Sequence, residues 1–176
     1  MDALVSFANW FIGLFEAGAE NLTSLVTGTL PLVAVMMTAI TAIIKFIGED
    51  RVNHFCEKIA KYPIMRYTIL PLVSFFCFGN PICCTTARFL PEKYKISYEV
   101  SLFSIAHPLT GLFPHVNSAE LFVWLGIAEG VQELGYDTTG LAIWYLLIGI
   151  VVGLVRGLVC QQIWEFYAKK RGLEYA

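Results

Sequence analysis

Long apolar stretches alternate along the chain with short charged segments. Four stretches lack Asp, Glu, Lys and Arg entirely: residues 21–44, 67–87, 100–119 and 138–155. A helix needs about 20 apolar residues to cross a bilayer whose hydrocarbon core is about 30 Å thick. The pattern therefore predicts an all-α integral membrane protein with three to five transmembrane helices.

Helix-breaking residues interrupt two of these stretches. Gly79, Asn80 and Pro81 divide the stretch 67–87, and Asn followed by Pro is a favourable helix start, so one helix should end near Phe78. The segment Pro114–Asn117 divides the stretch 100–119. Irregular backbone at membrane depth is tolerated where protein or a water-filled cavity covers it. We therefore expect discontinuous or re-entrant segments near Asn80-Pro81 and near Pro114–Asn117.

The same pattern predicts one membrane-embedded domain over residues 1–176, built from four parts. The first part, residues 1–20, contains an apolar run that is too short to span the membrane, so it should be an interfacial helix. In the last part, Gly149 and Gly153 form a G-x-x-x-G motif, which permits close helix packing. The four parts are the interfacial helix 1–20, a connector 45–66, a broken-helix core 67–128, and a span with an amphipathic tail 138–168.

Basic residues are distributed unevenly between the connecting segments. The connector Lys45–Arg66 and the loop Arg88–Lys95 are basic, whereas Glu129–Asp137 is acidic. Since Lys and Arg mark the cytoplasmic side, both basic segments and the C-terminus should be cytoplasmic and the acidic segment external. The loop Arg88–Lys95 reaches the cytoplasm only if residues 67–87 form a re-entrant hairpin. Five complete crossings are the alternative.

Composition supports membrane insertion and limits the possible chemistry. Hydrophobic residues make up 57% of the chain and charged residues 15%, against about a quarter in soluble domains. The net charge of −2 gives no argument for nucleic acid binding. The five cysteines lack metal-ligand spacing and predict no disulfide framework. We expect no cofactor and no metal.

Polar side chains gather at the two interruptions. Amide, imidazole and carboxylate groups there combine donors and acceptors that suit a polyol or sugar better than an ion. Asn117 and Glu120 also have the spacing of a capping box, in which Glu120 would serve the helix backbone instead of a ligand. The candidate substrate-binding residues are Asn80, Arg88, His107, His115, Asn117 and Glu120.

Several runs resemble the glucitol/sorbitol-specific enzyme IIC component of the bacterial phosphotransferase system. The resemblance covers nearly the whole chain. It is carried by Trp10–Phe15, Asn80-Pro81, Arg88–Lys95, Gly111–His115, Asn117, Glu120–Val123 and Leu125–Ala128. It includes five of the six candidate residues, all except His107.

The resemblance implies a multi-pass protein of the bacterial inner membrane that moves sorbitol inward, coupled to its phosphorylation to sorbitol 6-phosphate. It implies a partner membrane subunit whose IIB domain donates the phosphoryl group, and a IIA protein that supplies that domain. This chain would then hold no catalytic residue. We expect lipid contact and a dimeric complex. The sequence does not distinguish sorbitol from galactitol or mannitol as the substrate.

Two other functions remain open from the residues alone. A non-transporting scaffold subunit of a membrane complex would share the composition. A membrane-embedded metalloenzyme would use His107, His115 and Glu120, but their spacings do not match a metal-binding helix motif such as H-E-x-x-H.

Overall fold

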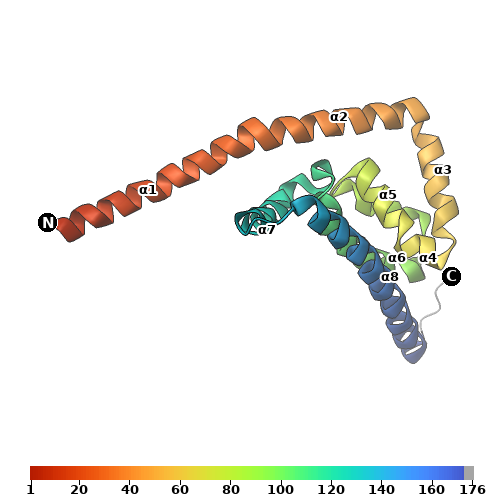
Figure 1. Cartoon of the computed structure of the whole chain (residues 1–176). Helices are drawn as coiled ribbons and strands as arrows, with labels where there is room; N and C mark the ends of the chain where they lie inside the picture. Colours follow the sequence, from red (N-terminus) through yellow and green to blue (C-terminus); the bar gives the residue numbers. More distant parts are fainter. Residues whose placement is uncertain (173–176) are drawn as a thin grey trace. The chain divides into compact units, whose positions relative to one another are not determined.

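The computed structural model describes residues 1–172, which are helical and contain no β-strand, as the sequence predicts. The chain divides into two compact units, residues 1–39 and residues 40 onward, and each is described by itself. In chain order the elements are α1 (Asp2–Ser24), η1 (Leu25–Thr29), α2 (Leu30–Ile47), α3 (Glu49–Ala60), α4 (Pro63–Tyr67), α5 (Ile69–Phe78), η2 (Ile82–Phe89), α6 (Glu92–Thr110), η3 (Pro114–Glu120), α7 (Leu121–Glu133) and α8 (Thr138–Arg171) (Figure 1).

The first unit is a single helix that runs without interruption through Pro31. The five residues of η1, immediately before α2, are wound as a π-helix. The ring of Pro31 would clash with the carbonyl of Thr27, four residues earlier, in a regular α-helix. The wider turn of η1 accommodates the ring and keeps the helix continuous. The predicted boundary near residue 20 is absent, since α1 continues to Ser24 and the helical path to Ile47.

Two helical segments among residues 1–172 are long and apolar enough to cross a membrane, Asp2–Ile47 and Thr138–Arg171. This agrees with an all-α membrane protein. Helix α5 is apolar but has only 10 residues, and so is about 15 Å long, half the hydrocarbon thickness. The number of crossings therefore stays a prediction.

Helices α6 and α8 pack antiparallel in the second unit (Figure 1), with Gly149 and Gly153 of α8 against α6 and Gly157 of α8 against α4. A Cβ placed on Gly149 would lie 2.6 Å from the ring of Pro108, and one on Gly153 would lie 3.2 Å from Ile105. A Cβ on Gly157 would lie 2.6 Å from the ring of Tyr67. The predicted G-x-x-x-G motif therefore serves contacts within this chain.

Helix α5 and η2 form a hairpin whose two arms are joined by buried hydroxyl groups. The Ser74 hydroxyl lies 2.9 Å from that of Thr86 and 2.8 Å from the phenol of Tyr98 on α6. At the end of the returning arm, Arg88 Nη2 donates to Asn53 Oδ1 on α3 across 3.2 Å. The chain thus enters and returns to the same end, which is the shape expected of a re-entrant segment.

Candidate functional site

The two predicted helix interruptions contact each other. Helix α5 ends at Phe78, and Gly79 follows with φ of +65°, a conformation that favours glycine. The backbone N–H of Asn80 then leaves the helix and donates to the Val116 carbonyl across 2.8 Å. Val116 lies in η3, the 3-10 segment of the second interruption. Residues 36 positions apart in sequence are therefore brought together by a backbone hydrogen bond.

Four of the predicted residues form one connected set at this junction, which we call the polar cluster: Asn80, His107, Asn117 and Glu120. Asn80 Nδ2 donates to Asn117 Oδ1 across 3.1 Å, and Asn117 Nδ2 donates to Glu120 Oε2 across 2.8 Å. The same Glu120 oxygen lies 3.1 Å from His107 Nε2. The polar cluster joins the hairpin tip, α6 and the start of α7.

The carboxylate fixes the direction of these hydrogen bonds. Since an ionised Glu120 only accepts, the NH₂ group of Asn117 must face it, and the Asn117 carbonyl must face the donating amide of Asn80. Asn117 has φ of −146° and ψ of 66°, and it is 1% exposed. Neither Asn117 nor Glu120 makes a side-chain hydrogen bond that caps η3 or α7. The capping-box geometry is therefore not formed.

His115 lies beside the polar cluster and completes the end of α5. Its Nε2 is 3.1 Å from the carbonyl oxygen of Phe76. That carbonyl would accept from the Asn80 N–H if the helix continued, so the imidazole replaces the lost donor. With the proton on Nε2, Nδ1 is an acceptor, and it is buried without a hydrogen-bond partner in the described part of the chain. The His115 ring also meets Phe76 edge-on, with centroids 5.5 Å apart.

Arg88 is the one predicted residue that the structure places elsewhere. It lies at the end of η2, where it is exposed and bonded to Asn53. It also stands over the ring of Phe89, 4.8 Å from the centroid. These contacts are near the base of the hairpin, whereas the polar cluster is at its tip.

The polar cluster combines a buried centre with accessible ends. The side chains of His107 and Glu120 are 39% and 45% exposed, and Asn80 is exposed. Glu120 Oε1, His107 Nδ1 and Asn80 Oδ1 make no hydrogen bond to any other part of residues 1–172. Hydroxyl groups both donate and accept, so a polyol matches such a row of free acceptors and amide donors.

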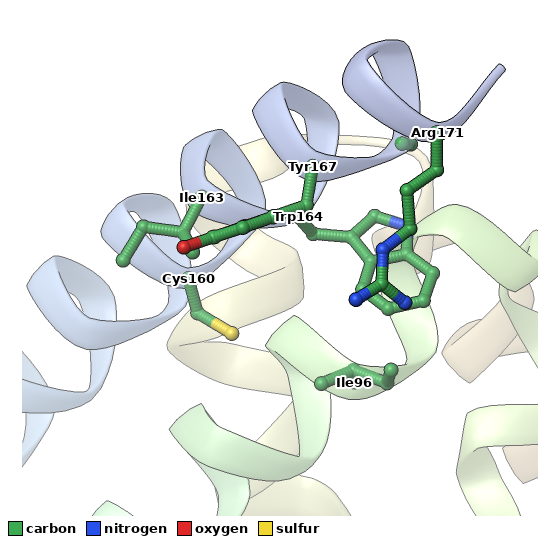
Figure 2. A pocket seen from close by; sticks show the side chains of 7 residues that line it. Ile96, Cys160, Ile163, Trp164, Tyr167 and Arg171 are labelled. Atoms are coloured by element: carbon green, nitrogen blue, oxygen red, sulfur yellow. The ribbon is translucent and has the colours of Figure 1, made fainter. Parts of the chain in front are cut away.

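A cavity of about 540 Å³ near the C-terminal end of α8 has different chemistry (Figure 2). It is lined mainly by apolar side chains, with Arg171 at one side and Ile96 of α6 opposite α8. Ile96 lies about three helical turns from His107 along α6, and none of the six candidate residues lines the cavity. The cavity does place the start of α6 beside the end of α8.

Sequence reasoning did not find the backbone carbonyl of Phe76 or the hydroxyl groups of Ser74, Thr86 and Tyr98. The carbonyl had a signal, because it lies four residues before the interruption at Asn80 and must lose its helical partner. The hydroxyl residues are scattered over three segments, and nothing in their spacing marks them as neighbours. In the described ranges, no three His, Cys, Asp or Glu residues are grouped so that they could hold a metal.

Comparison with known proteins gives one consistent result. The family model described as the PTS system enzyme II sorbitol-specific factor matches residues 4–170. A protein of Clostridium beijerinckii, the PTS system glucitol/sorbitol-specific EIIC component, is 40% identical over 174 residues, which cover 99% of this chain and 96% of that protein. No solved structure matches.

Proposed function

Because this chain belongs to the sorbitol-specific enzyme II family of the phosphotransferase system, we propose that it is the membrane permease component that binds sorbitol and moves it inward. Translocation is coupled to phosphorylation of sorbitol to sorbitol 6-phosphate by the IIB domain of a partner membrane subunit, which a IIA protein supplies. The complex is an oligomer in the bacterial inner membrane, and this chain crosses it several times.

The observation that carries the substrate site is the polar cluster at the junction of two helix interruptions. Transporters commonly build substrate sites from discontinuous helices near the membrane midplane, where freed backbone groups and polar side chains replace water. Here the interruptions meet through Asn80 and Val116, and Glu120 offers a free carboxylate oxygen. Sorbitol hydroxyls donate to Glu120 and exchange hydrogen bonds with Asn80 and His107. His115 positions the end of α5.

Sorbitol binding by the Glu120→Gln variant tests this site. Gln can still accept from Asn117, so the polar cluster and the fold persist, but the charged acceptor is lost. Hydrogen bonds to charged groups contribute roughly 1.5–3 kcal/mol, against about 1 kcal/mol for neutral pairs. We expect the affinity for sorbitol to fall about tenfold or more. Equilibrium binding of radiolabelled sorbitol to the purified protein gives the measurement.

Glu129→Gln is the matched control, since Glu129 is an exposed carboxylate of α7 outside the polar cluster. It should bind sorbitol as the parent protein does. Wild-type affinity in Glu120→Gln, with unchanged thermal stability, would remove Glu120 from the substrate site and leave His115 and Asn80 as candidates.

The phosphoryl group is carried by the partner subunit and not by this chain. Cys56 lies in the connector, where burial raises the pKa of its thiol to about 11. The nucleophilic thiolate is therefore scarce at neutral pH. Labelled phosphoenolpyruvate, with all components of the system present, should leave this polypeptide unlabelled. A stable label on it would contradict the assignment.

The basic connector, the loop Arg88–Lys95 and the end of α8 all face the cytoplasm, and Glu129–Asp137 faces outward. The Arg88–Asn53 hydrogen bond supports one side for the first two segments, and the cavity between Ile96 and α8 supports it for the third. A Lys93→Cys variant in a cysteine-free background should react with an impermeant maleimide only from the cytoplasmic side. Labelling from outside would favour five complete crossings.

A further inference from the structure

A hollow of about 690 Å³ lies where α3, α4, η2 and the start of α6 meet. We call it the cationic pocket, because Lys58, Lys61, Arg66 and Arg88 line it. Glu57 is the one carboxylate on its wall, and it faces His54 on the same helix at 3.7 Å. Four positive charges against one negative charge leave a formal charge of +3 around the hollow, with His54 neutral.

Arg66 forms the rigid part of this wall. It is 4% exposed, and its guanidinium lies 3.7 Å from the centroid of the Tyr94 ring. Nε donates to the Ala60 carbonyl across 2.8 Å, and Nη2 donates to the Lys61 carbonyl across 3.3 Å. Stacking and two hydrogen bonds hold the plane of the guanidinium in place, which is how arginine is prepared for binding an oxyanion.

One nitrogen of this guanidinium is left over. Nη1 is buried and has no hydrogen-bond partner within residues 1–172, and no Asp or Glu of that range forms an ion pair with Arg66. Capping the carbonyls at the end of α3 explains Nε and Nη2 but leaves Nη1 unexplained. A buried charged donor without an acceptor is destabilising. Arg66, one of the residues that line the pocket, therefore has one guanidinium nitrogen without an acceptor among the described residues.

The rule that basic residues gather on the cytoplasmic side explains why these cations share one end of the protein. It does not explain their convergence on a hollow, since residues that only mark a membrane face need no burial and no common wall. Arg88 illustrates this convergence. The segment η2 places it in the wall of the pocket beside α3, away from the polar cluster.

We propose that the cationic pocket binds a phosphate monoester, with Arg66, Arg88 and the two lysines as its ligands. This rests on the proposed function in one respect, since a permease that delivers a sugar for phosphorylation works where a phosphate ester forms. A monoester carries a charge of about −1.5 to −2 at pH 7 and three acceptor oxygens, which suits several converging donors. The phosphate belongs either to a soluble monoester or to a lipid headgroup.

Binding of ethyl phosphate to the full-length protein tests the pocket, because this monoester lacks the hexitol and has no reason to enter the sorbitol site. Broadening of its ³¹P resonance is measured in dodecyl maltoside, a detergent without phosphorus. The double variant Lys58→Gln/Lys61→Gln changes only exposed residues and should fold normally. We expect its affinity to fall about tenfold, and that of Lys170→Gln, a charge-matched control on α8, to stay unchanged.

Adding lipid to the same sample separates the two sources of phosphate. If a soluble monoester is the ligand, phosphatidic acid leaves the broadening intact. If a headgroup occupies the pocket, phosphatidic acid, whose phosphate is a monoester, abolishes the broadening, and phosphatidylcholine, whose phosphate is a diester, does not. Both results support a phosphate site, provided that the double variant weakens binding. Equal binding by the parent protein, the double variant and Lys170→Gln would overturn it, as would no binding of ethyl phosphate or phosphatidic acid by the parent protein.

Sorbitol binding in the same samples keeps this inference separate from the permease proposal. The double variant should bind sorbitol normally, because neither lysine touches the polar cluster. Sorbitol binding without phosphate binding would defeat the cationic pocket alone. Phosphate binding without sorbitol binding would defeat the proposed substrate and leave the pocket standing.

Discussion

The N-terminal helix and the broken-helix core both contain proline within apolar stretches. The helix continues past the proline in the first region and is interrupted in the second. The π-helical segment η1 accommodates the ring of Pro31, and the helix continues on both sides of it. Helix α5 instead ends before Pro81, and η3 begins at Pro114. At the interruption before Pro81, His115 and Val116 from another segment bond the backbone groups that the helix no longer satisfies.

The side-chain hydrogen bonds that the structure shows within residues 1–39 go to the backbone of the same helix. The hydroxyls of Thr23, Thr27 and Thr38 each donate to the carbonyl four residues earlier across 2.8 Å. In the core, Asn80 and His115 reach groups 37 and 39 residues away. A helix is kept where side chains satisfy it locally, and it is broken where distant segments supply the partners. The broken region is where a substrate can find unsatisfied groups.

The largest expected effect comes from removing the centre of the polar cluster. Asn117→Leu leaves Asn80 Nδ2 and Glu120 Oε2 without the Asn117 amide, and each loss is destabilising by about 1–3 kcal/mol when the group is buried. Both ends are partly exposed, so we expect the free energy of unfolding to fall by about 2–4 kcal/mol in total. Chemical denaturation in detergent micelles gives the measurement.

Asn21→Leu is the matched control in the N-terminal helix. Asn21 is exposed, and its side chain makes no hydrogen bond among residues 1–172. Its replacement should change stability by less than about 0.5 kcal/mol. Equal effects of the two substitutions would remove the contrast between a locally satisfied helix and a cross-linked core.

A second pair of variants compares glycines in the two regions. A Cβ on Gly149 would lie 2.6 Å from the rigid ring of Pro108, whereas a Cβ on Gly28 would meet nothing within 4 Å. Gly149→Ala must push α6 and α8 apart, so it should destabilise by about 1–3 kcal/mol. Gly28→Ala should be neutral or stabilise by up to about 1 kcal/mol, because Ala favours helix. Chemical denaturation measures both variants. A free energy of unfolding for Gly149→Ala equal to that of the parent protein would contradict the close α6–α8 contact.

The sequence was sufficient to locate both interruptions, because glycine, proline and asparagine act on the backbone locally. It also indicated that Asn80, His107, Asn117 and Glu120 need partners, because they are polar groups in or beside apolar stretches, and the structure connects these four side chains. The sequence could not assign those partners. The spacing of Asn117 and Glu120 fits a capping box, yet the amide faces the carboxylate instead of the helix backbone. That choice depends on Asn80, which arrives from another segment.

Two further features lay beyond sequence reasoning for the same physical reason. The resemblance grouped Arg88 with the other candidates, but only the return of η2 places it beside α3 and away from the polar cluster. The expected interfacial helix over residues 1–20 was based on an apolar run too short to span the membrane. Neither Gly18 nor Asn21 breaks the helix, which continues to Ser24.

The smallest expected effect concerns how helices begin in the two regions. Asp137 accepts from the backbone N–H groups of Gly140 across 2.9 Å and Thr139 across 3.2 Å at the start of α8. These donors hold the pKa of Asp137 below its ordinary value of 3.8. Helix α1 has an acidic residue, Asp2, in its first turn but no side-chain cap. The Asp137 carboxylate should therefore couple the stability of α8 to pH.

A depressed pKa in the folded state means that Asp137 contributes its stability above pH 3.8 and loses it as the pH falls through the lower, folded value. Asp137→Ala should accordingly lower the thermal midpoint at pH 7 by a smaller amount than Gly149→Ala does, and the deficit should shrink as the pH is lowered below 3.8. Asp137→Asn keeps a good cap without a titrating group, so its midpoint should vary less with pH than that of the parent protein. Asp2→Ala removes no side-chain cap, so its thermal midpoint at pH 7 should match that of the parent protein. A deficit in Asp137→Ala that is equal at all pH values would show that the carboxylate does not act through its charge at the start of α8.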